Sequence, residues 1–72
     1  MSIYQRLRNL REDAEKSQEE IAKLLGTSQS YYAQYENGKR AIPFDRVVLL
    51  AEYYNVSLDY IAGFIDTPKK IM

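Results

Sequence analysis

The strongest constraint in this chain is a pair of short helical segments separated by only three residues. Ser17 and Glu20 have the spacing of a capping box, in which the serine hydroxyl accepts a hydrogen bond from the Glu20 amide and the glutamate carboxylate accepts one from the Ser17 amide. A helix is predicted to follow over 18–25, and Gly26 is suited to end it in a left-handed conformation. Ser28 can cap a second helix, over 29–37.

Two helices joined by so short a turn form either a helix-turn-helix or an ordinary hairpin of helices. Ala22 lies where the two helices would meet, and its small side chain allows a close approach. Tyr32 and Tyr35 share one side of the second helix and are expected in the core. Spacing alone leaves both arrangements open.

Three further helices are predicted around this pair. An apolar stripe of Ile3, Leu7, Leu10 and Ala14 predicts a helix over 3–15. Pro43 can occupy the first turn of another helix, in which its missing N–H costs nothing. The expected buried stripe of that helix is Phe44, Val47, Val48, Ala51 and Tyr54.

The last helix is expected over 58–62, capped by Ser57 and closed by Gly63, after Asn55 has ended the previous helix in a left-handed conformation. The prediction is therefore an all-α fold of five helices without strands. One domain is expected over 1–65, with its helix-turn-helix at 18–37 and a tail over 66–72.

Composition removes several classes of function. The 72 residues include no cysteine and no histidine, so we expect no disulfide, no metal site, no cofactor and no enzyme. No apolar run reaches 18 residues, so we expect no membrane span and a cytoplasmic location. The net charge is zero. Arg6, Arg8 and Arg11 precede an acidic stretch over 12–20 and are expected to form a solvated helix face.

The motifs resemble those of the Cro/repressor-like family of helix-turn-helix regulators, also called xenobiotic-response-element-type regulators. The similarity covers 3–63, and its motifs are Ser17-Gln18-Glu19-Glu20-Ile21-Ala22, Leu25-Gly26-Thr27-Ser28, Tyr35-Glu36-Asn37-Gly38-Lys39-Arg40 and Ala51-Glu52-Tyr53-Tyr54-Asn55-Val56-Ser57-Leu58-Asp59-Tyr60. The resemblance implies a five-helix lambda-repressor-like fold that binds double-stranded DNA and regulates transcription as a repressor. The helix over 29–37 would enter the major groove.

This chain departs from the family in three ways. Glu15-Lys16 stands where many members carry Gly-Leu, and Tyr32 stands where Val or Ile is usual. The helix over 29–37 contains no arginine, although many members place one there.

The candidate DNA-binding residues divide by chemistry. Gln29 and Gln34 carry carboxamides that can bond N6 and N7 of adenine together, and with Ser30 they match base-contacting positions of the family. Tyr31 is expected to contact a phosphate or a thymine methyl, or else to lie over its own helix. The residues expected to meet phosphates are Gln18, Asn37, Lys39 and Arg40.

The active form is predicted to be a homodimer on a palindromic operator. A cluster of apolar residues late in the chain is the candidate interface, with a role in covering the core as the alternative: Tyr53, Tyr60, Phe64 and Ile65. No small-molecule ligand is expected within this chain. A protein-interaction or antitoxin-like module on the same fold remains the rival function.

Overall fold

The computed structural model describes residues 1–67 and shows five helices there. Four of these helices begin with a serine whose hydroxyl accepts a hydrogen bond from a backbone amide of the first turn. The helices are α1 (Ile3–Asp13), α2 (Gln18–Leu25), α3 (Gln29–Glu36), α4 (Phe44–Tyr54) and α5 (Leu58–Ala62). No strand occurs in this part of the chain, so the predicted all-α fold is confirmed. The predicted tail lies largely outside the described residues. None of the five helices is long and apolar enough to cross a membrane.

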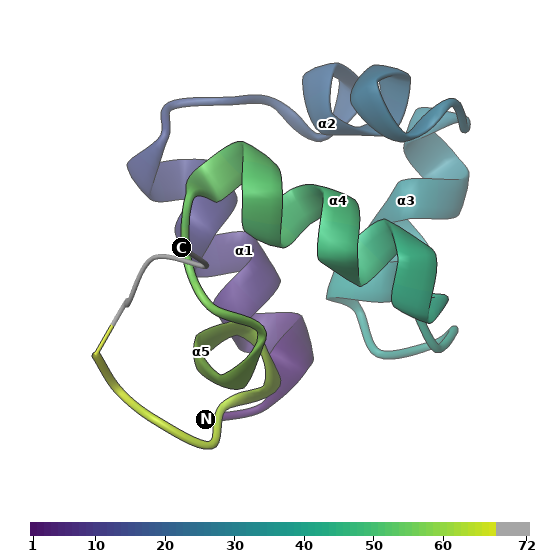
Figure 1. Ribbon diagram of the computed structural model, residues 1–72. Coiled ribbons are helices and arrows are strands. Elements are labelled where there is room, and N and C mark those ends of the chain that lie inside the picture. Colours follow the sequence, from purple (N-terminus) through teal and green to yellow (C-terminus); the bar gives the residue numbers. More distant parts are fainter. Residues whose placement is uncertain (68–72) are drawn as a thin grey trace.

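The helices pack around one core. α2 lies against α3, while α1 contacts both α3 and α5, and α4 packs on α5 (Figure 1). Figure 1 shows α4 crossing in front of α1, between α5 and the α2–α3 pair. The buried apolar residues come from all five helices and from the segment before α5: Leu7, Ile21, Ala22, Leu25, Tyr32, Tyr35, Val47, Leu50, Ala51, Val56 and Ile61.

The two core tyrosines of α3 confirm the prediction made for them. The rings of Tyr32 and Tyr35 are almost fully buried and meet edge to face, with centroids 6.0 Å apart. This is a favourable geometry for aromatic pairs, because the positive edge of one ring meets the negative face of the other.

Two expectations about α1 are wrong. The helix ends at Asp13 instead of Glu15, and Ala14 is exposed as its C-cap residue. Glu15 has a φ of 57°, so the chain turns through a left-handed residue there. The Lys16 amide bonds the Arg11 carbonyl at 3.1 Å, which closes the turn and ends the helix. The small difference at α3, which ends one residue before Asn37, is of the kind expected at helix ends.

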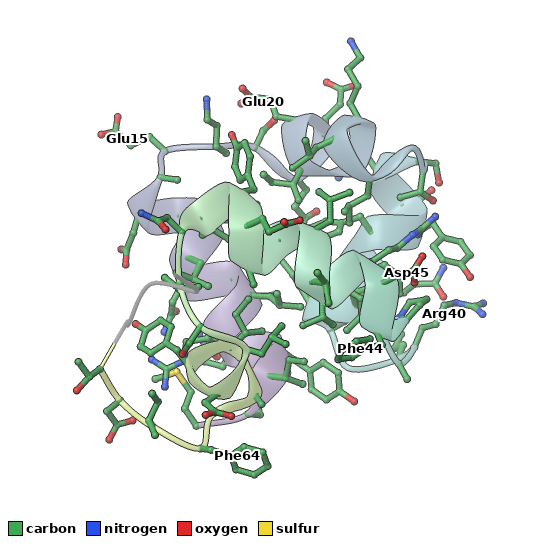
Figure 2. All side chains as sticks on the ribbon, viewed as in Figure 1. Glu15, Glu20, Arg40, Phe44, Asp45 and Phe64 are labelled. Atoms are coloured by element: carbon green, nitrogen blue, oxygen red, sulfur yellow. The ribbon has the colours of Figure 1, made fainter. Side chains whose placement is uncertain are left out.

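One predicted core residue of α4 is also wrong. Phe44 is 70% exposed, whereas Leu50, which the predicted stripe omitted, is fully buried. Phe44 is the first residue of the helix, and Figure 2 shows it at the outer end of α4. By helical periodicity Phe44 falls on the buried side of α4, but the core does not extend to the first turn of this helix.

Candidate nucleic-acid interface

The turn between α2 and α3 has the geometry expected from its sequence. Gly26 is left-handed, with φ 74° and ψ 32°, and Ser28 accepts a hydrogen bond from the Tyr31 amide at 3.1 Å. The Thr27 amide bonds the Ala22 carbonyl at 2.9 Å. Ala22 itself is buried in the core. These contacts join the two helices tightly, so α3 is placed by α2.

A buried carboxylate at the end of α3 connects three helices. The Glu36 side chain is fully buried, and Arg11 of α1 donates to its two oxygens at 2.8 and 3.1 Å. Gln18 of α2 donates to the same carboxylate at 3.1 Å, and the Arg8 guanidinium lies 3.6 Å away. Two parallel hydrogen bonds between arginine and carboxylate form the strongest common type of ion pair. This contact therefore fixes the orientation of α3 relative to α1.

The ionisation of Glu36 follows from these neighbours. Burial alone would raise its pKa, but hydrogen bonds from Arg11 and Gln18 and the charge of Arg11 hold that pKa below its ordinary value. Burial, and then the nearby carboxylate, raise the pKa of the Tyr32 hydroxyl. That hydroxyl forms no hydrogen bond of standard geometry with any residue in the described range. Glu36 is thus ionised but compensated by α1.

The first residue of α3 is oriented by α2. Gln29 donates from its amide nitrogen to the Gln18 side-chain oxygen at 3.1 Å, while Gln18 donates onward to Glu36. Gln18 therefore links the buried carboxylate to Gln29. Gln29 keeps its own amide oxygen and one N–H for another partner.

The end of α3 carries a second group of polar contacts. The Arg40 guanidinium lies 4.6 Å from the centre of the Tyr31 ring, and its Nε donates to the Gln34 side-chain oxygen at 3.2 Å. The backbone amides of Lys39 and Arg40 both bond the Gln34 carbonyl, at 2.9 and 3.2 Å. The loop after α3 therefore folds back over the helix. The Asn37 side chain accepts from Arg8 at 3.5 Å.

Comparison with known proteins agrees with this geometry. The sequence model of the family described as "Helix-turn-helix" matches residues 7–61, which is most of the chain. The chain belongs to the helix-turn-helix family. Its sequence is 42% identical to that of an uncharacterized HTH-type transcriptional regulator, YobD, of Bacillus subtilis (strain 168), over 89% of this chain and 57% of YobD. The chain spans little more than half the length of the curated relatives it matches.

Two solved structures share the fold. A transcriptional regulator from Listeria innocua has a TM-score of 0.84 at 23% identity, covering 89% of this chain and 60% of that one. The P22 c2 repressor, solved with a synthetic operator, has a TM-score of 0.78 at 21% identity, covering 88% of this chain and 96% of that one. The five-helix repressor-like fold inferred from the motifs is therefore confirmed.

The structure groups some of the candidate residues and separates others. It pairs Gln18 with Gln29, and it brings Gln34 together with Tyr31 and Arg40. Ser30 and Lys39 are exposed. Contacts with DNA stay a prediction for all eight candidates: Gln18, Gln29, Ser30, Tyr31, Gln34, Asn37, Lys39 and Arg40.

The expectation that the arginines of α1 form a solvated face is wrong. Arg11 and Arg8 pair with Glu36, and Arg6 is buried with its guanidinium 3.9 Å from the centre of the Tyr60 ring. Glu36 itself was missed. The sequence does contain a signal for it, because Tyr32, Tyr35 and Glu36 follow one another at helical spacing on the buried side of α3.

The candidate dimer residues differ in exposure. Phe64 is 81% exposed and Tyr53 is 44% exposed, so both are available to a partner. Tyr60 packs against the core beneath Arg6, and the Ile65 carbonyl accepts from Arg6 at 3.3 Å. The alternative role of covering the core therefore suits Tyr60 better than Phe64, while Ile65 is half-buried and contacts Arg6 through its backbone. The dimer itself stays a prediction.

Proposed function

We propose that this domain binds double-stranded DNA through α3 in the major groove and regulates transcription as a repressor. The observation that carries the proposal is the relay from Glu36 through Gln18 to Gln29, which orients a carboxamide at the outer start of α3. The relatives and structural neighbours support it, since they are transcriptional regulators and include one repressor crystallised with operator DNA.

The chemistry of Gln29 suits base recognition. With one N–H held by Gln18, the remaining N–H can donate to N7 of adenine and the oxygen can accept from N6. The side chain would reach the base already oriented, so less conformational entropy is lost on binding.

The charge distribution also suits a polyanionic partner despite the net charge of zero. Glu36, the only acidic residue of α3, is paired with Arg11 and Arg8 and presents no free negative charge. Lys39 and Arg40 follow it on an exposed loop and would contact phosphates. On this proposal the domain acts by binding and not by catalysis, in the cytoplasm with the DNA.

Measurement of binding to sequences selected from a random DNA pool tests the proposal. Gln29→Ala should weaken specific binding by about 1–3 kcal/mol and relax the preference at one base pair.

Lys39→Ala should weaken binding to all sequences alike and reduce the slope of log affinity against log salt by about one. Failure of the wild-type domain to bind any DNA at low salt would refute the proposal and favour a protein-interaction module.

A further inference from the structure

The contact between Arg40 and Gln34 fixes which end of the Gln34 amide is available. A guanidinium group has donors and no acceptor, so the atom that faces the Arg40 Nε at 3.2 Å must be the amide oxygen. The Gln34 amide nitrogen donates to no side chain or backbone group within residues 1–67. The Gln34 amide donors are therefore free, while one of the two lone pairs of its oxygen is engaged by a cation.

This arrangement changes what Gln34 can recognise. A carboxamide reads adenine by donating to N7 and accepting from N6 at the same time, and the second bond needs a free amide oxygen. Guanine presents two acceptors in the major groove, N7 and O6, and thymine presents O4. A carboxamide whose oxygen already accepts from a cation keeps one lone pair for adenine N6, but that oxygen is a weaker acceptor and its N–H groups are stronger donors. It therefore matches guanine and thymine better and has a smaller advantage at adenine.

We propose that Arg40 sets the base preference of Gln34, making it a donor that selects guanine or thymine over adenine. Arg40 is then a positioning residue for specificity, although it lies outside α3. The inference rests on the proposed function and adds a rule for one position of the operator.

Two further contacts hold Arg40 in place. Its guanidinium lies over the Tyr31 ring at 4.6 Å, within the range of a cation–π interaction. Its backbone amide bonds the Gln34 carbonyl, so main chain and side chain of Arg40 are both tied to Gln34. The two terminal nitrogens of the guanidinium are not used in the Gln34 bond and can meet a phosphate at the same time.

The test compares base preferences of variants on DNA selected from a random pool. Gln34→Ala identifies the base pair that Gln34 reads, because discrimination is lost there. At that pair the wild-type domain should prefer guanine or thymine. Arg40→Ala frees the Gln34 oxygen and should shift the relative preference towards adenine by about fivefold or more. Circular dichroism melting of each variant verifies that it is folded.

Lys39→Ala is the matched control, since it removes the same charge from the same loop and keeps the backbone bond between Lys39 and Gln34. It should weaken binding and leave the base preference unchanged. Tyr31→Phe keeps the ring beneath the guanidinium and should also keep the preference.

The outcomes separate the two proposals. The role of Arg40 would be overturned if Arg40→Ala selected the same base as the wild type at the Gln34 position. It would also be overturned if the wild type preferred adenine there. Either result would leave the proposed function intact. Absence of any enriched sequence for the wild-type domain would overturn both.

Discussion

Glu36 is the residue on which the orientation of α3 depends most. Burial of a charge is costly unless hydrogen bonds and an opposite charge compensate it, and here Arg11 and Gln18 provide both. Gln18 also accepts from Gln29. A change at Glu36 would therefore affect stability and the first residue of α3 together.

We predict that Glu36→Gln destabilises the domain at neutral pH, by at most about 3–5 kcal/mol. The pKa of Glu36 is lowered in the folded state, so the unfolded chain binds its proton first as the pH falls. The stabilisation is complete above the ordinary value of 4.5 and is lost as the pH falls through the lowered folded value. The difference in unfolding free energy between wild type and variant should therefore shrink in acid. Urea unfolding at a series of pH values measures it.

Glu52→Gln serves as the control, because Glu52 is exposed on α4. Its unfolding free energy should follow the wild-type curve at every pH. The difference in unfolding free energy between Glu36→Gln and wild type could instead stay constant down to strongly acidic pH. That result would show that the carboxylate charge does not stabilise the fold.

Three helices end in a left-handed C-cap residue, whereas α1 and α3 reach a left-handed residue one position later, at Glu15 and Gly38. α2, α4 and α5 end in left-handed residues that tolerate this conformation, namely Gly26, Asn55 and Gly63. After α1 the left-handed residue is Glu15. Glu15 is exposed, and Figure 2 shows its side chain directed away from the helices.

We predict that Glu15→Gly stabilises the domain. Glycine removes a steric cost of about 1–2 kcal/mol for a left-handed residue, although part of this gain is lost to the greater entropy of the unfolded chain. A net gain of about 0.5–1 kcal/mol would raise the melting temperature by roughly 2–8 °C in a chain of this size. Thermal unfolding followed by circular dichroism measures the change.

The matched control is Glu12→Gly, which removes a similar charge three residues earlier, within α1. Glycine inside a helix should lower stability by about 0.5–1 kcal/mol. Destabilisation by both substitutions would contradict the strain assigned to Glu15.

The domain as a whole is small compared with the operators that repressors read. Its extents are 29 × 22 × 20 Å, and a dimer needs recognition helices about 34 Å apart to read two half-sites. Two copies side by side are longer than this distance along the line that joins them, so a pair is large enough to hold two α3 helices at that spacing. Figure 2 shows Phe64 projecting beyond α5, far from Arg40 at the end of α3, so a partner there would leave the candidate DNA surface free.

We predict that two protomers bind one palindromic operator, and that Phe64→Glu lowers affinity for the palindrome because it places a charge in the interface. The variant should bind an isolated half-site as the wild type does. Sedimentation equilibrium gives the stoichiometry, and fluorescence anisotropy gives the two affinities. One protomer per saturated palindrome would rule out the dimer, and equal loss on both DNAs would place Phe64 outside its interface.

Most of the starts and ends of the helices could be predicted from the sequence alone, although Pro43 precedes α4 as its N-cap residue and does not lie in its first turn. The Ser17–Glu20 capping box, the Ser57 cap and the left-handed Gly26 and Asn55 all occur as expected. Each depends on hydrogen bonds between residues a few positions apart, so the information is local. The end of α1 was missed because Glu15, unlike a glycine or an asparagine, does not indicate a left-handed conformation. The chain needs that conformation only to turn from α1 into α2.

The polar contacts that orient the candidate site were decided by the tertiary structure. Arg11 lies 25 residues from Glu36, and Gln29 lies 11 residues from Gln18. Helical periodicity shows which side of a helix faces inward, but it shows neither which distant side chain lies opposite nor how far the core extends. That is why α1 was expected to present a solvated arginine face and Phe44 was expected to be buried. Both outcomes depend on where neighbouring helices lie, which is set only when all five pack together.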